Sequence, residues 1–142
     1  MDTTTYSALK KETAVIEREN GIVVFIPSAW VIGGEDRVSY TTIIRLVECC
    51  REYHWAKDIK SQNEIFDSIC GNISFRFTKS IGLNSTININ YSVKEAAGKK
   101  YTVEFIVMDE NGETCCLAEI VSFFYNPLTR QSIEIPKGIF PL

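Results

Sequence analysis

The spacing of apolar residues changes along the chain and separates an N-terminal stretch from the rest. Residues 1–19 are polar apart from a weak alternation at 13–17, which predicts either a short edge strand or a loose arm. Gly21–Ile26 is a run of β-branched and aromatic residues that Pro27 ends, as is typical of a β-strand. We therefore expect an N-terminal arm over residues 1–19 and a single domain over residues 20–142.

A helical period begins at Ser39 and continues to Trp55. Apolar residues recur there at every third or fourth position, which predicts an α-helix. They are Ile43, Ile44, Leu46, Val47, Cys50, Tyr53 and His54. Either Ser39 or Asp36 is placed to cap the first turn. Few charged residues interrupt the series, so we expect other elements to cover this helix on most sides.

The second half of the chain alternates with a period of two. The predicted antiparallel strands cover residues 69–80, 85–94, 101–108 and 114–125, with a short one at 133–135. A polar connector over residues 57–67, with room for a helical turn, precedes them. Asn111-Gly112 is typical of a hairpin turn between the last two long strands. In each strand one face is apolar and the other polar, so we expect one face to be buried.

One long apolar helix beside one antiparallel sheet predicts an α+β domain of two layers. A sheet of this size encloses the helix only if it curves around it. A single copy would leave one edge of the sheet and one flank of the helix uncovered. Because open edges need cover, we expect a homodimer or a homotetramer.

Composition narrows the class of protein. The chain has 142 residues, of which 45% are hydrophobic and 23% charged, which is ordinary for one folded domain. Its formal net charge of -3 argues against a nucleic-acid partner, because phosphate backbones are bound largely by Lys and Arg. No run of apolar residues reaches the roughly 18 that a membrane span requires, and we expect no membrane partner.

The cysteines and the N-terminus bear on location and on cofactors. The chain has five cysteines, an odd number, and none has the spacing to another Cys or His that zinc sites use. We interpret them as reduced packing residues and expect no metal and no other cofactor. Since the N-terminus lacks a signal-peptide pattern, we expect a cytoplasmic protein.

Three segments of the chain, at residues 44–52, 73–82 and 107–119, together resemble the hotdog-fold acyl thioesterases of the 4-hydroxybenzoyl-CoA thioesterase-like superfamily. Residues 44–52 resemble the family's helix, in which a Glu is followed three residues later by an Arg. Residues 73–82 resemble its strand and turn, and residues 107–119 its Asp-x-x-Gly hairpin with the strand that follows. Across residues 20–136 the resemblance implies a curved antiparallel sheet wrapped around one long central helix.

The resemblance also implies an activity, the hydrolysis of an acyl thioester of CoA or of an acyl carrier protein. In such enzymes a carboxylate attacks the thioester or activates a water, and a backbone amide at the helix start polarises the carbonyl. One branch places this carboxylate in the loop before the helix. Gly33 occupies that position here, and Glu35 and Asp36 are the nearest acids. Acids before a helix also commonly cap it, so both roles stay open for these two residues.

A second branch carries the carboxylate on the helix, and Leu46-Val47-Glu48 resembles its motif. A third, the enediyne polyketide thioesterases, lacks the carboxylate and keeps a Cys-Arg-Glu that Cys50-Arg51-Glu52 matches. Because the loop acid is absent here, we expect a biosynthetic role such as polyketide or fatty-acid release. Glu48 is therefore a candidate general base or nucleophile, or a partner of Arg51 or Arg45 in an ion pair. Arg51 is a candidate for binding the thioester oxygen, a substrate carboxylate or a phosphate.

The candidates for substrate binding lie at the helix start and on a strand. The amides of Val38, Ser39 and Tyr40, with the hydroxyls of the last two, could donate hydrogen bonds to a substrate, although capping and packing explain them equally. Phe77 could line an acyl site or belong to the core. His54, the single histidine, is interpreted as a packing or surface residue, which also argues against serine-hydrolase chemistry.

Three hypotheses follow. The first is a thioesterase with Glu48, Arg51, Glu35 and Asp36 as candidate catalytic residues. The second is a non-catalytic hotdog protein that binds an acyl chain or an acyl carrier protein. The third, a hotdog dehydratase, needs a histidine near the helix start, and residues 29–42 contain none.

Overall fold

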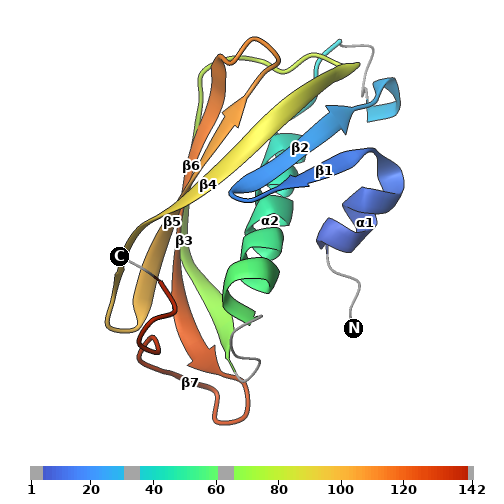
Figure 1. The fold of residues 1–142 in the computed structure, drawn as a ribbon. Helices are drawn as coiled ribbons and strands as arrows, with labels where there is room; N and C mark the ends of the chain where they lie inside the picture. The colour runs from blue at the N-terminus through green and yellow to red at the C-terminus, as the bar shows by residue number, and fades with distance from the viewer. Residues whose placement is uncertain (1–4, 31–35, 61–65, 141–142) are drawn as a thin grey trace.

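The computed structural model describes residues 5–30, 36–60 and 66–140, which form one curved sheet around a central helix (Figure 1). The helices are α1 (Thr5–Glu12) and α2 (Tyr40–His54), with a short 3-10 helix at Ser28–Trp30 and a π-helical stretch at Trp55–Lys60. The strands are β1 (Val15–Arg18), β2 (Gly21–Ile26), β3 (Asp67–Phe77), β4 (Ser85–Ala97), β5 (Lys100–Met108), β6 (Thr114–Asn126) and β7 (Gln131–Ser132).

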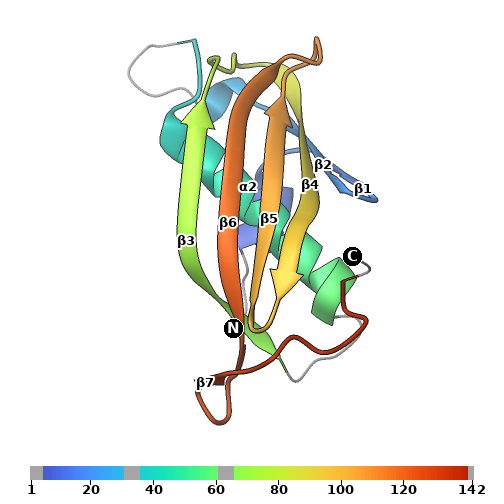
Figure 2. The same cartoon turned by 90° about the vertical axis from the view of Figure 1, so that its left-hand side faces the viewer.

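The sheet has the strand order β1-β2-β4-β5-β6-β3, and β7 pairs with β6. All of its pairings are antiparallel. The helix α2 lies on its concave side, and the convex side faces away from it (Figures 1 and 2). The predicted α+β architecture, a curved sheet wrapped around one long helix, is confirmed.

Helix α2 owes its position to an almost continuous apolar surface. Ile43, Leu46 and Val47 are completely buried, as are the sheet residues Ile89 and Phe105 that belong to the same core. Burial of such side chains stabilises the fold by roughly 1.5–3 kcal/mol each. Among the strands, α2 packs mainly against β4 and β2, and α1 packs on a further side of it. It therefore sits closer to the β2–β4 half of the sheet than to β3.

Strand β3 forms the edge of the sheet beyond β6, as Figure 2 shows. A bulge between Cys70 and Asn72 shifts its pairing with β6. Gly71 lies in this bulge, where an added Cβ would stand 2.5 Å from a ring carbon of Phe123. The expectation that the apolar face of this strand is buried is wrong for Ile73, which is 43% exposed, because α2 does not extend over the edge strand.

Some local elements differ from those that the sequence predicts. Of the two alternatives for the start of the chain, residues 15–18 form an edge strand, and the unpredicted α1 precedes it. The short strand predicted at 133–135 lies at Gln131–Ser132 instead. The helical turn allowed in the connector is the π-helical stretch. Among the described residues, no helix is long and apolar enough to cross a membrane.

Candidate functional site

One flank of α2 faces the edge strand, and we call it the helix–β3 face. It comprises Tyr40, Ile44, Glu48 and Arg51 of α2 with Ser68, Ile73, Phe75 and Phe77 of β3. The helical residues are spaced by three or four positions and so share one side of α2. The ring centroids of Tyr40 and Phe77 lie 4.4 Å apart, and Arg51 Nη1 donates to Ser68 Oγ at 3.4 Å. These two contacts define the ends of the face, and two predicted substrate-binding residues meet at one of them.

Glu48 and Arg51 form an ion pair on this face. Arg51 Nε donates to Glu48 Oε1 at 3.3 Å, and the two side chains are 33% and 19% exposed in the order Glu48, Arg51. Arg45, the other partner that the sequence allows for Glu48, pairs instead with Glu12 of α1, and this hydrogen bond raises the pKa of Arg45. The charged residues of α2 are thus divided between its two sides.

The three residues that match the Cys-Arg-Glu motif are likewise directed to different sides of α2. Cys50 is completely buried, its Sγ lies 3.7 Å from the carbonyl oxygen of Ile89, and burial raises the pKa of its thiol. Glu52 accepts a hydrogen bond from the Tyr6 amide of α1 at 3.4 Å. Of the three residues in that motif, only Arg51 reaches the helix–β3 face.

The start of α2 is capped, which occupies several of the predicted donors. Ser39 is the N-cap, and its Oγ accepts from the Thr42 amide at 3.2 Å, so the alternative cap Asp36 is not used. The Val38 amide donates to the Ile81 carbonyl at 3.0 Å and is therefore not available to a substrate. Within the part of the chain that is described, no acceptor is found for the Tyr40 amide at the first turn.

Glu48 and the helix start lie too far apart to contact one carbonyl within a single protomer. Eight residues separate Tyr40 from Glu48, which corresponds to about 12 Å along the axis at 1.5 Å per residue. The structure therefore brings Glu48 together with Arg51, and Tyr40 together with Phe77. It does not bring these two pairs together.

The candidate acids of the preceding loop give less information. Glu35 and the position of Gly33 lie outside the described residues. Asp36 is exposed, and its backbone carbonyl accepts a hydrogen bond from the Leu83 amide at 3.3 Å. Asp36 stays a predicted catalytic residue that no contact with Glu48 or Arg51 supports.

The structure also forms a polar cluster that the sequence did not reveal. His54 is 2% exposed, and its Nδ1 lies 2.8 Å from Asp58 Oδ2, which Tyr91 of β4 also contacts. Of the packing and surface roles that the sequence left open for His54, this burial confirms packing. The four-residue spacing of His54 and Asp58 was a visible signal, whereas Tyr91 enters only through the fold. This cluster does not belong to the helix–β3 face.

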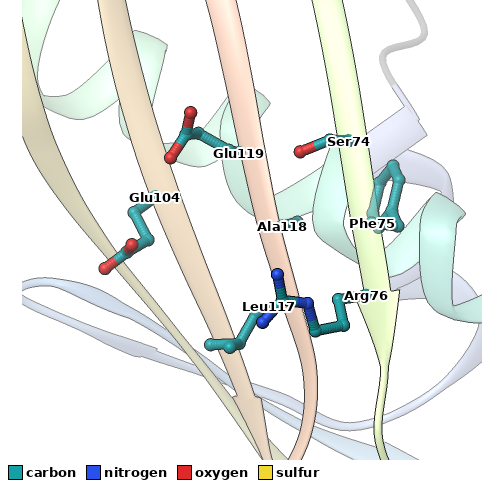
Figure 3. Close-up of a pocket in the computed structure, with 7 residues that line it drawn as sticks. All are labelled: Ser74, Phe75, Arg76, Glu104, Leu117, Ala118 and Glu119. Atoms are coloured by element: carbon teal, nitrogen blue, oxygen red, sulfur yellow. The ribbon is translucent and has the colours of Figure 1, made fainter.

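The convex face carries a shallow pocket of about 320 Å³ (Figure 3). The side chains of Arg76, Glu104 and Glu119 lie there, on the side of the sheet that faces away from α2. Glu104 and Glu119 lie opposite each other on β5 and β6, and Lys94 pairs with Glu119 at 2.8 Å. The pocket contains none of the candidate catalytic residues. Within the described residues, no group of three or more His, Cys, Asp or Glu could hold a metal ion.

Comparison with known proteins finds solved structures of similar fold. No family model matches the chain, and no curated protein matches it. Among solved structures, the probable thioesterase YbaW from Escherichia coli has a TM-score of 0.74 at 12% identity, over 85% of this chain and 93% of that one. A predicted thioesterase from Bacillus stearothermophilus has a TM-score of 0.74 at 13% identity, with coverages of 84% and 90%.

A further similar structure is a mutant 4-hydroxybenzoyl-CoA thioesterase in complex with 4-hydroxybenzoyl-CoA. Its TM-score is 0.70 at 14% identity, over 84% of this chain and 94% of that one. Similarity at such low identities establishes the fold alone. The hotdog fold that the sequence resemblance implied is confirmed.

Proposed function

We propose that this protein hydrolyses an acyl thioester of CoA at the helix–β3 face, with Glu48 as the catalytic carboxylate. The observation that carries the proposal is the orientation of Glu48. Arg45 and Glu52 of the same helix contact α1, whereas Glu48 points to the uncovered β3 side and is held there by Arg51. Solved structures of the same fold are thioesterases by name, and one holds a CoA thioester.

The chemistry needs no group beyond these side chains and a water. Glu48 takes a proton from a water molecule whose oxygen adds to the thioester carbonyl, or its carboxylate adds to that carbonyl itself. Spare N–H groups of Arg51 stabilise the negative charge that develops on the carbonyl oxygen. In the first route the C–S bond then breaks, the thiolate takes the proton held by Glu48, and the free acid leaves. In the second route the C–S bond breaks to leave an anhydride between the acyl group and Glu48. A water molecule then gives a proton to the thiolate while its oxygen hydrolyses the anhydride, which releases the free acid and restores Glu48.

A homodimer formed through β3 would complete the site. The edge strand β3 offers unpaired backbone groups to a second copy, and its side chain Ile73 is exposed. In an antiparallel, two-fold pairing the two α2 helices run in opposite directions. The helix start of one copy, with its Tyr40 amide, then approaches Glu48 of the other. Within one protomer Tyr40 and Glu48 lie about 12 Å apart along the helix axis, and this arrangement would bring the two groups together from different copies.

We further propose that an acyl carrier protein is the alternative carrier of the acyl group. The setting of the reaction would then be polyketide or fatty-acid biosynthesis. The Gly33 at the position of the loop acid and the match of Cys50-Arg51-Glu52 to the Cys-Arg-Glu motif support this setting. The test is thiol release from a panel of acyl-CoA and acyl-carrier-protein substrates, measured for wild type, Glu48→Gln and Glu52→Gln. Glu52 is the matched control, since it lies one turn away on α2 and faces α1.

The proposal expects Glu48→Gln to reduce thiol release at least about 100-fold and Glu52→Gln to leave it within about threefold, as for loss of a general base. Equal activity of Glu48→Gln and wild type would refute the assignment and move the chemistry to Asp36 or Glu35. Analytical ultracentrifugation of Ile73→Lys tests the dimer in parallel, with a monomer of low activity as the expected result.

A non-catalytic binding protein is the second candidate. The observation that favours it is the ion pair itself, because Arg51 already neutralises the only acid that the described part of α2 directs to β3. In that case no substrate releases thiol, and an acyl-CoA binds wild type and Glu48→Gln with equal affinity in calorimetry.

A further inference from the structure

A cavity of about 440 Å³ lies at the far end of α2, away from the helix–β3 face. His54, Asp58 and Tyr91 line one part of it, and Val93, Ile139 and Phe140 give it an apolar part. Its volume falls within the range of small-molecule sites, and the mixture of an apolar wall with a few convergent polar groups is typical of them.

The hydrogen bonds of Asp58 determine the tautomer of His54. Asp58 Oδ2 accepts from the Tyr91 hydroxyl and lies 2.8 Å from His54 Nδ1, while Lys57 Nζ donates to Oδ1 at 2.7 Å. Burial by itself raises the pKa of Asp58, but the hydrogen bonds from Lys57, Tyr91 and His54 outweigh it and lower that pKa. An ionised carboxylate only accepts, so Nδ1 must carry the hydrogen.

The other nitrogen of His54 is left as a bare acceptor. Burial lowers the pKa of His54 more than its hydrogen bond to Asp58 raises it, which keeps the ring neutral and Nε2 unprotonated. Nε2 is buried, and no donor from the described residues reaches it; no other buried side-chain nitrogen or oxygen of these residues is in this state. Buried polar atoms of native proteins are nearly always paired, so this acceptor calls for a donor.

The charges at the cavity limit what that donor is. Glu19 and Asp58 are acidic and Lys57 is basic, which gives these three lining residues a net charge of -1 and disfavours an anion. The described residues form no metal-binding group here, which disfavours a metal ion. An uncharged ligand with one O–H group and an apolar ring satisfies both the acceptor and the apolar wall.

We propose that this cavity binds an uncharged phenol or ring-bearing alcohol whose hydroxyl donates to His54 Nε2. The site is separate from the proposed thioesterase site and does not depend on it. Because Nε2 is shielded from solvent, lining side chains must move before the hydroxyl can reach it. Hydrogen bonding then fixes the hydroxyl, and the ring packs against Val93 and Phe140.

The single histidine makes the test direct. The 142-residue chain labelled with ¹⁵N only at histidine gives one pair of ring signals, which report the tautomer and the hydrogen bonding of Nε2. Phenol is titrated, and anisole, which has the same ring without an O–H, is the matched control ligand. We expect a saturable shift of the Nε2 signal with phenol that is at least about threefold larger than with anisole.

Two variants locate the effect. Asp58→Asn frees His54 to place its hydrogen on Nε2, so the phenol response should disappear while a thermal melt shows that the variant is folded. Glu134→Gln changes an exposed carboxylate of the C-terminal segment and should keep the full response. The proposal is overturned if free wild-type protein carries its hydrogen on Nε2, if phenol gives no saturable shift, or if anisole shifts the signal equally. An Nε2 already hydrogen-bonded to a trapped water, and unchanged by phenol, overturns it as well.

Discussion

Lowering the pH from 8 to 5 should destabilise the protein through its single histidine. Burial lowers the pKa of His54 from its ordinary value of 6.5. At a pH below 6.5 the unfolded chain therefore binds a proton that the folded chain does not. The stabilisation is complete above pH 6.5 and is lost as the pH falls through 6.5 toward the lower folded value. The free energy of unfolding must then decrease on acidification.

The magnitude follows from one titrating group. A single proton changes the free energy of unfolding by at most about 1.4 kcal/mol per pH unit, which limits the loss between pH 7 and pH 5 to about 2 kcal/mol. The other described groups whose pKa values are shifted titrate outside this range. Asp58, Asp109 and Glu17, whose pKa values are lowered, remove stability only below about pH 4.5, and burial raises the pKa of Cys116 to about 11. Between about pH 5 and pH 8 the change in the free energy of unfolding therefore reports the titration of His54.

Urea unfolding followed by tryptophan fluorescence at pH 8, 7, 6 and 5 measures this quantity. The wild-type free energy of unfolding should fall by about 1–2 kcal/mol, and that of His54→Gln should stay nearly constant over the same range. A parallel decrease in both proteins, or a rise for wild type at low pH, would refute the argument that His54 is buried in its neutral form.

Three further predictions concern a cap, a close approach and a thiol. Ser39→Ala removes the acceptor of the Thr42 amide and should lower the free energy of unfolding by about 1 kcal/mol, or the Tm by about 4 °C, whereas Ser39→Asp should stay near wild type. Gly21→Ala places a Cβ 2.0 Å from the Ile89 carbonyl oxygen and should cost at least about 2 kcal/mol in denaturant melts; Gly82→Ala, with its nearest atom at 4.0 Å, should be tolerated. Cys70, which is partly exposed, should react first with a thiol reagent in mass spectrometry, and labelling of buried Cys50 before unfolding would contradict its position in the core.

Periodicity was sufficient to predict most of the fold. The alternation of the long strands and the three- and four-residue spacing of α2 are local signals, and the boundaries agree to within a few residues. Helix α1 was missed because it buries only Tyr6 and Leu9, too few to set a period, and depends on packing against α2. The exposure of Ile73 was not predictable, because it depends on how far α2 lies from the edge strand.

The candidate site was predictable only in part. Helical spacing predicted an ion pair of Glu48 with either Arg51 or Arg45, and local sequence limited the cap to Ser39 or Asp36. Which flank of α2 faces β3 is a tertiary property, so the sequence left Arg45 and Arg51 as equal partners for Glu48. The cluster around His54 needed Tyr91 from β4, which no local pattern connects to α2.

The uncovered edge strand has a consequence for how the protein is produced. Strand β3 has 11 residues, and Ile69 and Ile73 on it are about half exposed. A freshly folded chain therefore presents a template on which strands of other chains can add and start aggregation. The bulge at Gly71 interrupts this template and shortens each regular stretch. Expression at high temperature and low chaperone supply should consequently yield inclusion bodies, and a Lys at position 73 should increase the soluble fraction even if it abolishes activity.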